Sequence, residues 1–291
     1  MGSGQSGLGR LSASDVGARE FNLPDRLNYK VSRRELKQAY RALGITPHDK
    51  LTRDLEHEFW VDSYNSIRNM QEVYDINPDE MHEMRFRPGN KYGTYASMNF
   101  DGSFTIQQSI RSDTYDGVQK TYEFDLKSGF HPQGTTVQDI MAHEYAHAIE
   151  AQLIRRIVPQ EVHNMFGGAT YVSDTNRIFA WADHTVANEI LNTARANLGL
   201  TQAGFASAVK SLTGYGYETM QSSSSADSGH HETFAEALSA YARLGKNSGA
   251  LATEVARLTK KMLKETRPQR ATKSSSTSTK KPRRIVKKGG S

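Results

Sequence analysis

One short segment constrains this chain more than any other. Residues 139–150 read DIMAHEYAHAIE, which places His143 and His147 four positions apart, with Glu144 directly after the first histidine. Side chains at positions i and i+4 lie on one face of a helix, about 6 Å apart at Cβ. The two imidazoles can therefore converge on one small cation, and Glu144 can reach a water molecule on that cation. The alternative is the polar face of an ordinary helix.

Two histidines do not complete a metal site. The chain contains no cysteine, which excludes disulfides, thiolate nucleophiles and iron–sulfur sites, so any metal must be held by His, Asp or Glu. A catalytic zinc needs three protein ligands and one open position. A third histidine on the same helix would stand at position 153 after a glycine at 150, but these residues are Leu153 and Glu150.

A later segment offers the third ligand. Residues 230–241, HHETFAEALSAY, carry Glu232 and Glu236 four positions apart on one helix face. Two stacked carboxylates repel one another unless a cation or a proton lies nearby. Zinc beside Glu232, with Glu236 accepting a hydrogen bond from a ligand imidazole, accounts for this spacing. The alternative is a solvated acidic stripe.

The pair HEYAH and ETFAEA resembles the gluzincin-type (HExxH…ExxAE) zinc metallopeptidases. Over residues 92–245 it is similar, more narrowly, to metallopeptidase domains of tailed-phage head proteins and of lethal-factor-like and polymorphic toxins. The resemblance implies that His143, His147 and Glu232 bind Zn²⁺, that Glu144 is the general base and that Glu236 supports a ligand. One departure is the 85 positions from His147 to Glu232, far more than the family pattern, which predicts inserted helices.

The implied activity is hydrolysis of a protein or peptide substrate, which needs a further donor for the oxyanion. Tyr215 and Tyr217, in TGYGYET, are the leading candidates, with His230 and His231 as rivals. The hairpin at 94–108 is expected to offer an edge strand to an extended substrate. We interpret His131 as a residue that structures its loop.

The periodicity predicts an α+β fold. Ser32 with Glu35 predicts a helix start, Thr136 with Asp139 predicts another, and Pro159 predicts the end of the motif helix. Further helices are expected from about 52 to 74 and at 181–198, 201–212, 231–244 and 249–265. The segment TYASMNFDGSFTIQQS alternates as a hairpin, for which we expect Met98 opposite Ile106 and Phe100 opposite Phe104. The resemblance makes the fold zincin-like, with a small antiparallel or mixed sheet on the HExxH helix and a helical N-terminal extension.

Composition divides the chain into four parts. We expect a disordered N-terminus at 1–20, a helical region at 21–88, the metallopeptidase domain at 89–265 and a disordered basic tail at 266–291. The tail holds nine Lys and Arg residues and no acidic residue. The whole chain has a net charge of +5, so residues 1–265 carry a net charge of about −4. Such a tail is either a solvated extension or a non-specific contact for nucleic acid.

No apolar run approaches the roughly 20 residues that cross a bilayer, so we expect no membrane partner. The N-terminus lacks the apolar core of an export signal. With the resemblance, this implies a place in the cytoplasm of a host cell or in a virion. An alternative function is a structural or DNA-associated virion protein with a vestigial protease fold.

Overall fold

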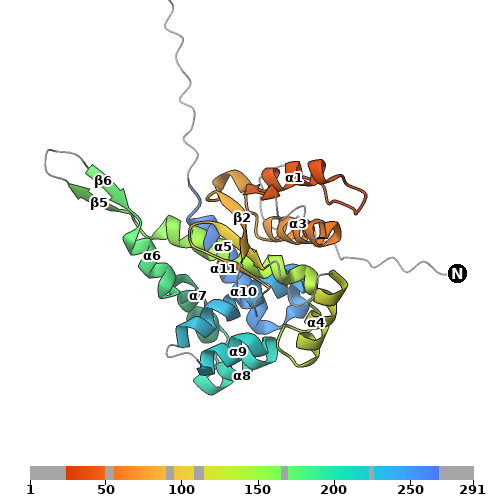
Figure 1. Ribbon diagram of the computed structural model, residues 1–291. Coiled ribbons are helices and arrows are strands. Elements are labelled where there is room, and N and C mark those ends of the chain that lie inside the picture. The colour runs from red at the N-terminus through yellow and green to blue at the C-terminus, as the bar shows by residue number, and fades with distance from the viewer. Residues whose placement is uncertain are drawn as a thin grey trace, which may run out of the picture.

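The computed structural model describes residues 24–49, 56–89, 95–107, 115–164, 170–222 and 226–268. The expected disordered N-terminus at 1–20 and nearly all of the basic tail at 266–291 lie outside these residues. Within them the fold is α+β, mostly helical, with a small mixed sheet (Figure 1).

The main sheet has four strands in the order β1-β2-β4-β3. β2 is parallel to both β1 and β4, whereas β3 and β4 form an antiparallel hairpin. β3 is therefore an edge strand. The bounds are β1 Ile45–Thr46, β2 Met84–Gly89, β3 Ala96–Met98 and β4 Ser103–Gln107.

The β3–β4 hairpin is confirmed, but its expected register is wrong by two residues. Met98 pairs with Phe104 and not with Ile106. The turn has the expected three residues but lies one position earlier, at residues 100–102, because the Asn99 amide donates to Ser103 O and Gly102 takes a left-handed φ of 86°. Since side chains alternate, a shift of two residues preserves the buried face, and Met98 and Phe104 are both buried.

The N-terminal region shares one core with the rest of the described chain. Helix α1 (Arg33–Ala42) begins at the predicted capping box of Ser32 and Glu35. Helix α3 (His57–Val73) packs against the motif helix, and Nε2 of Gln71 on α3 donates to the hydroxyl of Tyr145 at 2.9 Å. The region also supplies the strands β1 and β2, whereas the sequence predicts a helical region at 21–88. Position 88/89, where two parts were expected to meet, falls inside β2.

Several helices pack against the motif helix α5 (Ile140–Ile157), which ends just before Pro159 as predicted. Its longest neighbour is α10 (Ala226–Leu244), which also contacts α3, α7, α9 and α11. The remaining helices are α4 Tyr115–Lys127, α6 Thr175–Ala182, α7 Thr185–Asn197, α8 Gln202–Leu212, α9 Gly214–Ser222 and α11 Ala250–Glu265, with 3-10 turns at Pro78–Glu80, Val137–Asp139 and Gly245–Ser248. Helices α4 and α9 were not predicted, and neither was α6, which overlaps the helix expected at 181–198 by only two residues.

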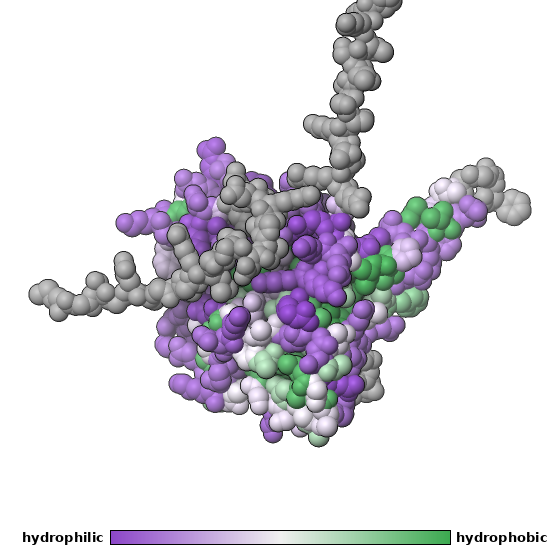
Figure 2. Space-filling view, turned by 180° about the vertical axis from the view of Figure 1, so that it is seen from behind, coloured by the Kyte–Doolittle hydropathy of each residue, from purple (hydrophilic) through white to green (hydrophobic). Residues whose placement is uncertain are grey.

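A second, two-stranded sheet projects from the body beyond α6 (Figure 1). It consists of β5 (Glu161–Asn164) and β6 (Thr170–Ser173) in antiparallel register. Figure 2 shows hydrophobic surface, in green, along this arm and at its base. The large apolar residues exposed on β5, β6 and α6 are Val162, Tyr171, Val172, Ile178 and Phe179. Over the described part of the chain, no helix combines the length and the hydropathy needed to cross a membrane.

Candidate metal centre

The start of the motif helix is fixed by its cap. Thr136 and Asp139 form a capping box, and the 3-10 turn that follows leads directly into α5. Most of α5 is buried, so the helix cannot rotate without exposing its core face. This fixes the direction in which His143 and His147 project.

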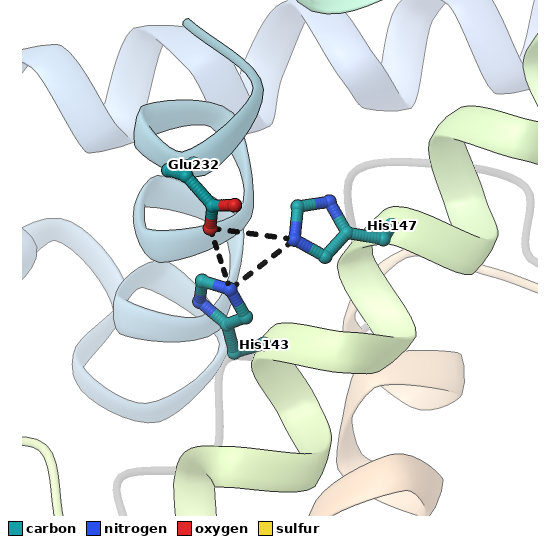
Figure 3. Close-up of side chains that lie close together, drawn as sticks. All are labelled: His143, His147 and Glu232. Atoms are coloured by element: carbon teal, nitrogen blue, oxygen red, sulfur yellow. Dashed lines mark hydrogen bonds and ion pairs between the residues drawn. The ribbon is translucent and has the colours of Figure 1, made fainter. Parts of the chain in front are cut away.

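The three predicted ligands converge (Figure 3). Nε2 of His143 lies 3.1 Å from Oε2 of Glu232 and 3.2 Å from Nε2 of His147. The third side of the triangle, from His147 Nε2 to Glu232 Oε2, is 3.6 Å. Zinc bonded tetrahedrally to N and O at about 2.0–2.1 Å separates its ligand atoms by roughly 3.3 Å. The donor atoms and their spacing therefore fit a zinc ion, with Glu232 arriving from α10.

Two of these three groups, His147 and Glu232, are in the charge state that suits binding of a divalent cation. Burial opposes the charge of the third, His143, but Glu236 and Glu232 raise its pKa well above the usual value, so this imidazole would release a proton when a metal binds. Burial lowers the pKa of His147 to about 4, with His231 adding to the effect, so its imidazole is neutral at pH 7. Burial opposes ionisation of Glu232, but hydrogen bonds to His143 and His147 outweigh it and hold the pKa of Glu232 well below its usual value. A neutral imidazole and an ionised carboxylate are the forms that bind metal.

Glu236 faces the ring nitrogen of His143 that points away from Glu232, as predicted. Its Oε1 is 3.6 Å from Nδ1 of His143 and 3.2 Å from Nδ1 of His131. Burial opposes its charge, but the His143 and His131 imidazoles lower the pKa of Glu236 to about 2. One buried carboxylate thus orients two imidazoles. The His131 ring stacks on Tyr122 at 4.4 Å, so this histidine, expected only to structure its loop, also supports Glu236.

Glu144 lines the same cavity, whose volume is about 450 Å³. Its side chain is almost entirely buried, and Oε2 has no hydrogen-bond partner among the described residues. Burial raises the pKa of Glu144 to about 7. A carboxyl group with a pKa near neutrality and one free oxygen is suited to accept and return a proton.

The two candidate tyrosines differ in position. Tyr215 lines the cavity, and its ring lies 6.3 Å from that of His143. Burial raises the pKa of Tyr215, with Glu232 and Glu144 adding to the effect, so the phenol keeps its proton. Tyr217 does not line the cavity and instead packs beneath Lys210, whose ammonium lies 5.2 Å from the ring. The structure brings together only the first of these candidates with the metal ligands.

The two alternative candidates, His230 and His231, also differ in position. His230 faces Asn188 and Phe205, away from the cavity. His231 lines the cavity and stacks on His147 at 3.9 Å, while its Nδ1 lies 2.8 Å from Oε2 of Glu150.

His147, Glu150 and His231 also lie close enough to be considered as a metal-binding group. However, the rings of His147 and His231 stack face to face with an interplanar angle of 21°, so their lone pairs lie in different planes. Glu150 already accepts from His231 and from the Ala187 amide. We infer that Glu150 and His231 hold the His147 ring in place and do not form a second metal site. This group was not predicted from the sequence, although His147 and Glu150, three positions apart, lie on one face of the motif helix.

Comparison with known proteins adds no relative: no family model, no curated protein and no solved structure matches the chain.

Proposed function

We propose that this chain is a zinc-dependent endopeptidase of the gluzincin type with a zincin-like fold. The observation that carries the proposal is the triangle of His143, His147 and Glu232, with Glu144 beside it in one cavity. Zinc held there would polarise a peptide carbonyl and lower the pKa of a water molecule toward about 7. Proton transfer and stabilisation of the oxyanion would then be carried out by side chains of this chain.

Glu144 is proposed as the general base. Its free Oε2 accepts the proton of the attacking water and then returns it to the departing amine. Its pKa of about 7 suits both transfers, because the group is then neither a weak base nor a weak acid at neutral pH. Tyr215 is proposed as the donor that stabilises the oxyanion, since its phenol is protonated and lines the cavity.

The position of β3 supports an extended substrate. β3 is the edge strand, and Ala96, Ser97 and Met98 all line the cavity. An edge strand has unpaired backbone groups that can pair with another chain. The Met98 amide also donates to Glu144, which links this edge to the proposed base. A peptide paired with β3 would therefore pass beside Glu144.

The test compares full-length wild type with Glu144→Gln. We expect both proteins to hold about one zinc per chain by elemental analysis, and only wild type to cleave denatured protein substrates. The variant should lose at least about 10²-fold in rate, because glutamine cannot accept the proton. Glu189→Gln, an exposed change on α7, is the matched control and should cleave like wild type. Cleavage that survives Glu144→Gln would contradict the mechanism, and zinc binding without cleavage would favour the architectural alternative.

A further inference from the structure

The residues that line the cavity include many aromatic and acidic side chains besides the proposed metal ligands. The lining combines four aromatic side chains with five carboxylates, and among the described residues that form it there is no lysine or arginine. The aromatic residues are Tyr95, Tyr122, Phe130 and Tyr215, and the acids are Asp125, Asp139, Glu144, Glu232 and Glu236. Aromatic faces and carboxylates together favour a cation that carries an apolar stem.

Three of the acids belong to the metal centre and its base, as described above. A fourth, Asp139, has partners of its own. It caps the start of α5 by accepting from the Thr136 amide at 2.8 Å, and it lies 3.3 Å from Nε of Arg243. Only Asp125 then remains without a charged partner or a catalytic role.

Asp125 has a neutral partner and an unfavourable position. Its Oδ2 accepts from the Tyr95 hydroxyl at 2.9 Å, which fixes the carboxylate without neutralising it. No ion pair to Asp125 occurs within the described residues. The residue stands in the last turn of α4, where the negative end of the helix dipole disfavours an anion, and the basic residue of that turn, Lys127, is exposed and forms no ion pair with Asp125 among the described residues. A bound cation would relieve this.

We propose that Asp125 determines specificity by receiving a lysine or arginine side chain of the substrate next to the bond that is cleaved. This inference rests on the proposed peptidase function and names its substrate class. The charged group pairs with Asp125, and the apolar stem lies along the rings of Tyr95 and Tyr122, whose centroids are 6.2 Å apart. Asp125 is linked to the ligand His143 only through the successive contacts of Tyr95, His131 and Glu236, so we expect a long side chain to fit better than a short one.

The first experiment digests a mixed peptide library with full-length, zinc-loaded protein and sequences the products by mass spectrometry. We expect lysine and arginine to be enriched at one position beside the cleaved bond, by about tenfold or more over neutral residues. Asp125→Asn should abolish the enrichment, and Asp125→Lys should shift it toward acidic residues. Glu123→Gln, an exposed loss of one negative charge on the same helix, is the matched control and should keep the wild-type preference.

The second experiment measures binding and does not depend on turnover. Peptides that differ only in lysine versus norleucine are titrated into zinc-loaded Glu144→Gln protein. We expect the lysine peptide to bind about tenfold more tightly, and this difference to vanish when Asp125→Asn is added.

Two results would overturn the inference: Glu144-dependent cleavage without a basic preference, or a preference that survives Asp125→Asn. Absence of all cleavage would instead contradict the proposed function. The binding experiment would then still decide whether Asp125 recognises a cation.

Discussion

Oε1 of Glu236 on α10 lies 3.6 Å from Nδ1 of His143 on α5, while the other ring nitrogen of that histidine faces Glu232 at 3.1 Å. A carboxylate on Nδ1 fixes the orientation of the ring and would direct the Nε2 lone pair toward a metal bound between His143, His147 and Glu232. The two carboxylates of α10 therefore have different roles, although they lie only one helical turn apart.

Replacing Glu236 should weaken the metal site without removing a ligand. For Glu236→Gln we expect zinc affinity to fall by about 10–100-fold, because the ligand His143 loses its anionic partner. Competition with a chromophoric chelator measures this change. Glu189→Gln, at an exposed position of α7 that does not line the cavity, should bind zinc like wild type. Equal affinity in Glu236→Gln and wild type would show that Glu236 does not support His143.

The two tyrosines of α9 offer a matched pair. Tyr215→Phe should lower kcat by about 10²-fold with little change in KM, because it removes a donor that acts on the developing oxyanion. Tyr217→Phe should leave kcat unchanged, since that ring packs on Lys210 outside the cavity. Both variants should keep their zinc. Steady-state kinetics on one peptide decide the matter, and equal effects from both substitutions would remove Tyr215 from the mechanism.

The buried pair of Glu150 and His231 should contribute to stability. Glu150 is fully buried, and its Oε2 lies 2.8 Å from Nδ1 of His231. Removing one partner of a buried pair typically costs about 3–5 kcal/mol, so Glu150→Ala should lower the free energy of unfolding by about that amount. Glu150→Gln should lose less, because its amide oxygen can still accept from His231. Urea unfolding of metal-free protein measures both. A loss below about 1 kcal/mol in the alanine variant would contradict this role.

Asp139 should make stability depend on pH. Burial raises the pKa of Asp139 from its ordinary value of 3.8 to about 6, despite the nearby Arg243. Between these values the folded state binds more protons than the unfolded state, so the free energy of unfolding falls as pH rises from about 4 to 6. The fall attributable to Asp139 is on the order of 3 kcal/mol. Asp139→Asn cannot titrate and should lack this part of the slope.

Urea unfolding at pH 4, 5 and 6 compares the two metal-free proteins, and the difference between their slopes isolates Asp139. Parallel curves would show that Asp139 has no raised pKa in the folded protein.

Local patterns in the sequence predicted local structure well. The capping boxes at Ser32 and Thr136 and the end of α5 before Pro159 are all present, because each depends on neighbours within a few residues. Helix α9 is one exception, and its sequence TGYGYET contains two glycines, which disfavour a helix. Its glycines serve close helix packing: a Cβ at Gly216 would lie 2.5 Å from Oγ1 of Thr233 on α10.

Relationships between distant elements could not be read in the same way. β1 has only two residues and β2 joins the sheet through parallel pairing, so neither gives an alternating pattern with a nearby turn. In the site, the convergence of His143, His147 and Glu232 was predicted from spacing within two helices together with the family resemblance. The support from His131 and His231 was missed, because each meets its carboxylate across 81 or more positions of sequence.

The central claim is that two imidazoles of α5 and one carboxylate of α10 bind a single zinc ion. X-ray absorption at the zinc edge, on protein loaded with one equivalent and dialysed, tests it most directly. We predict two imidazole nitrogens at about 2.0–2.1 Å with the remaining ligands oxygen, and loss of one oxygen or of the bound zinc in Glu232→Ala. Zinc that dialyses away from wild type, or a spectrum without imidazole scattering, would contradict the claim.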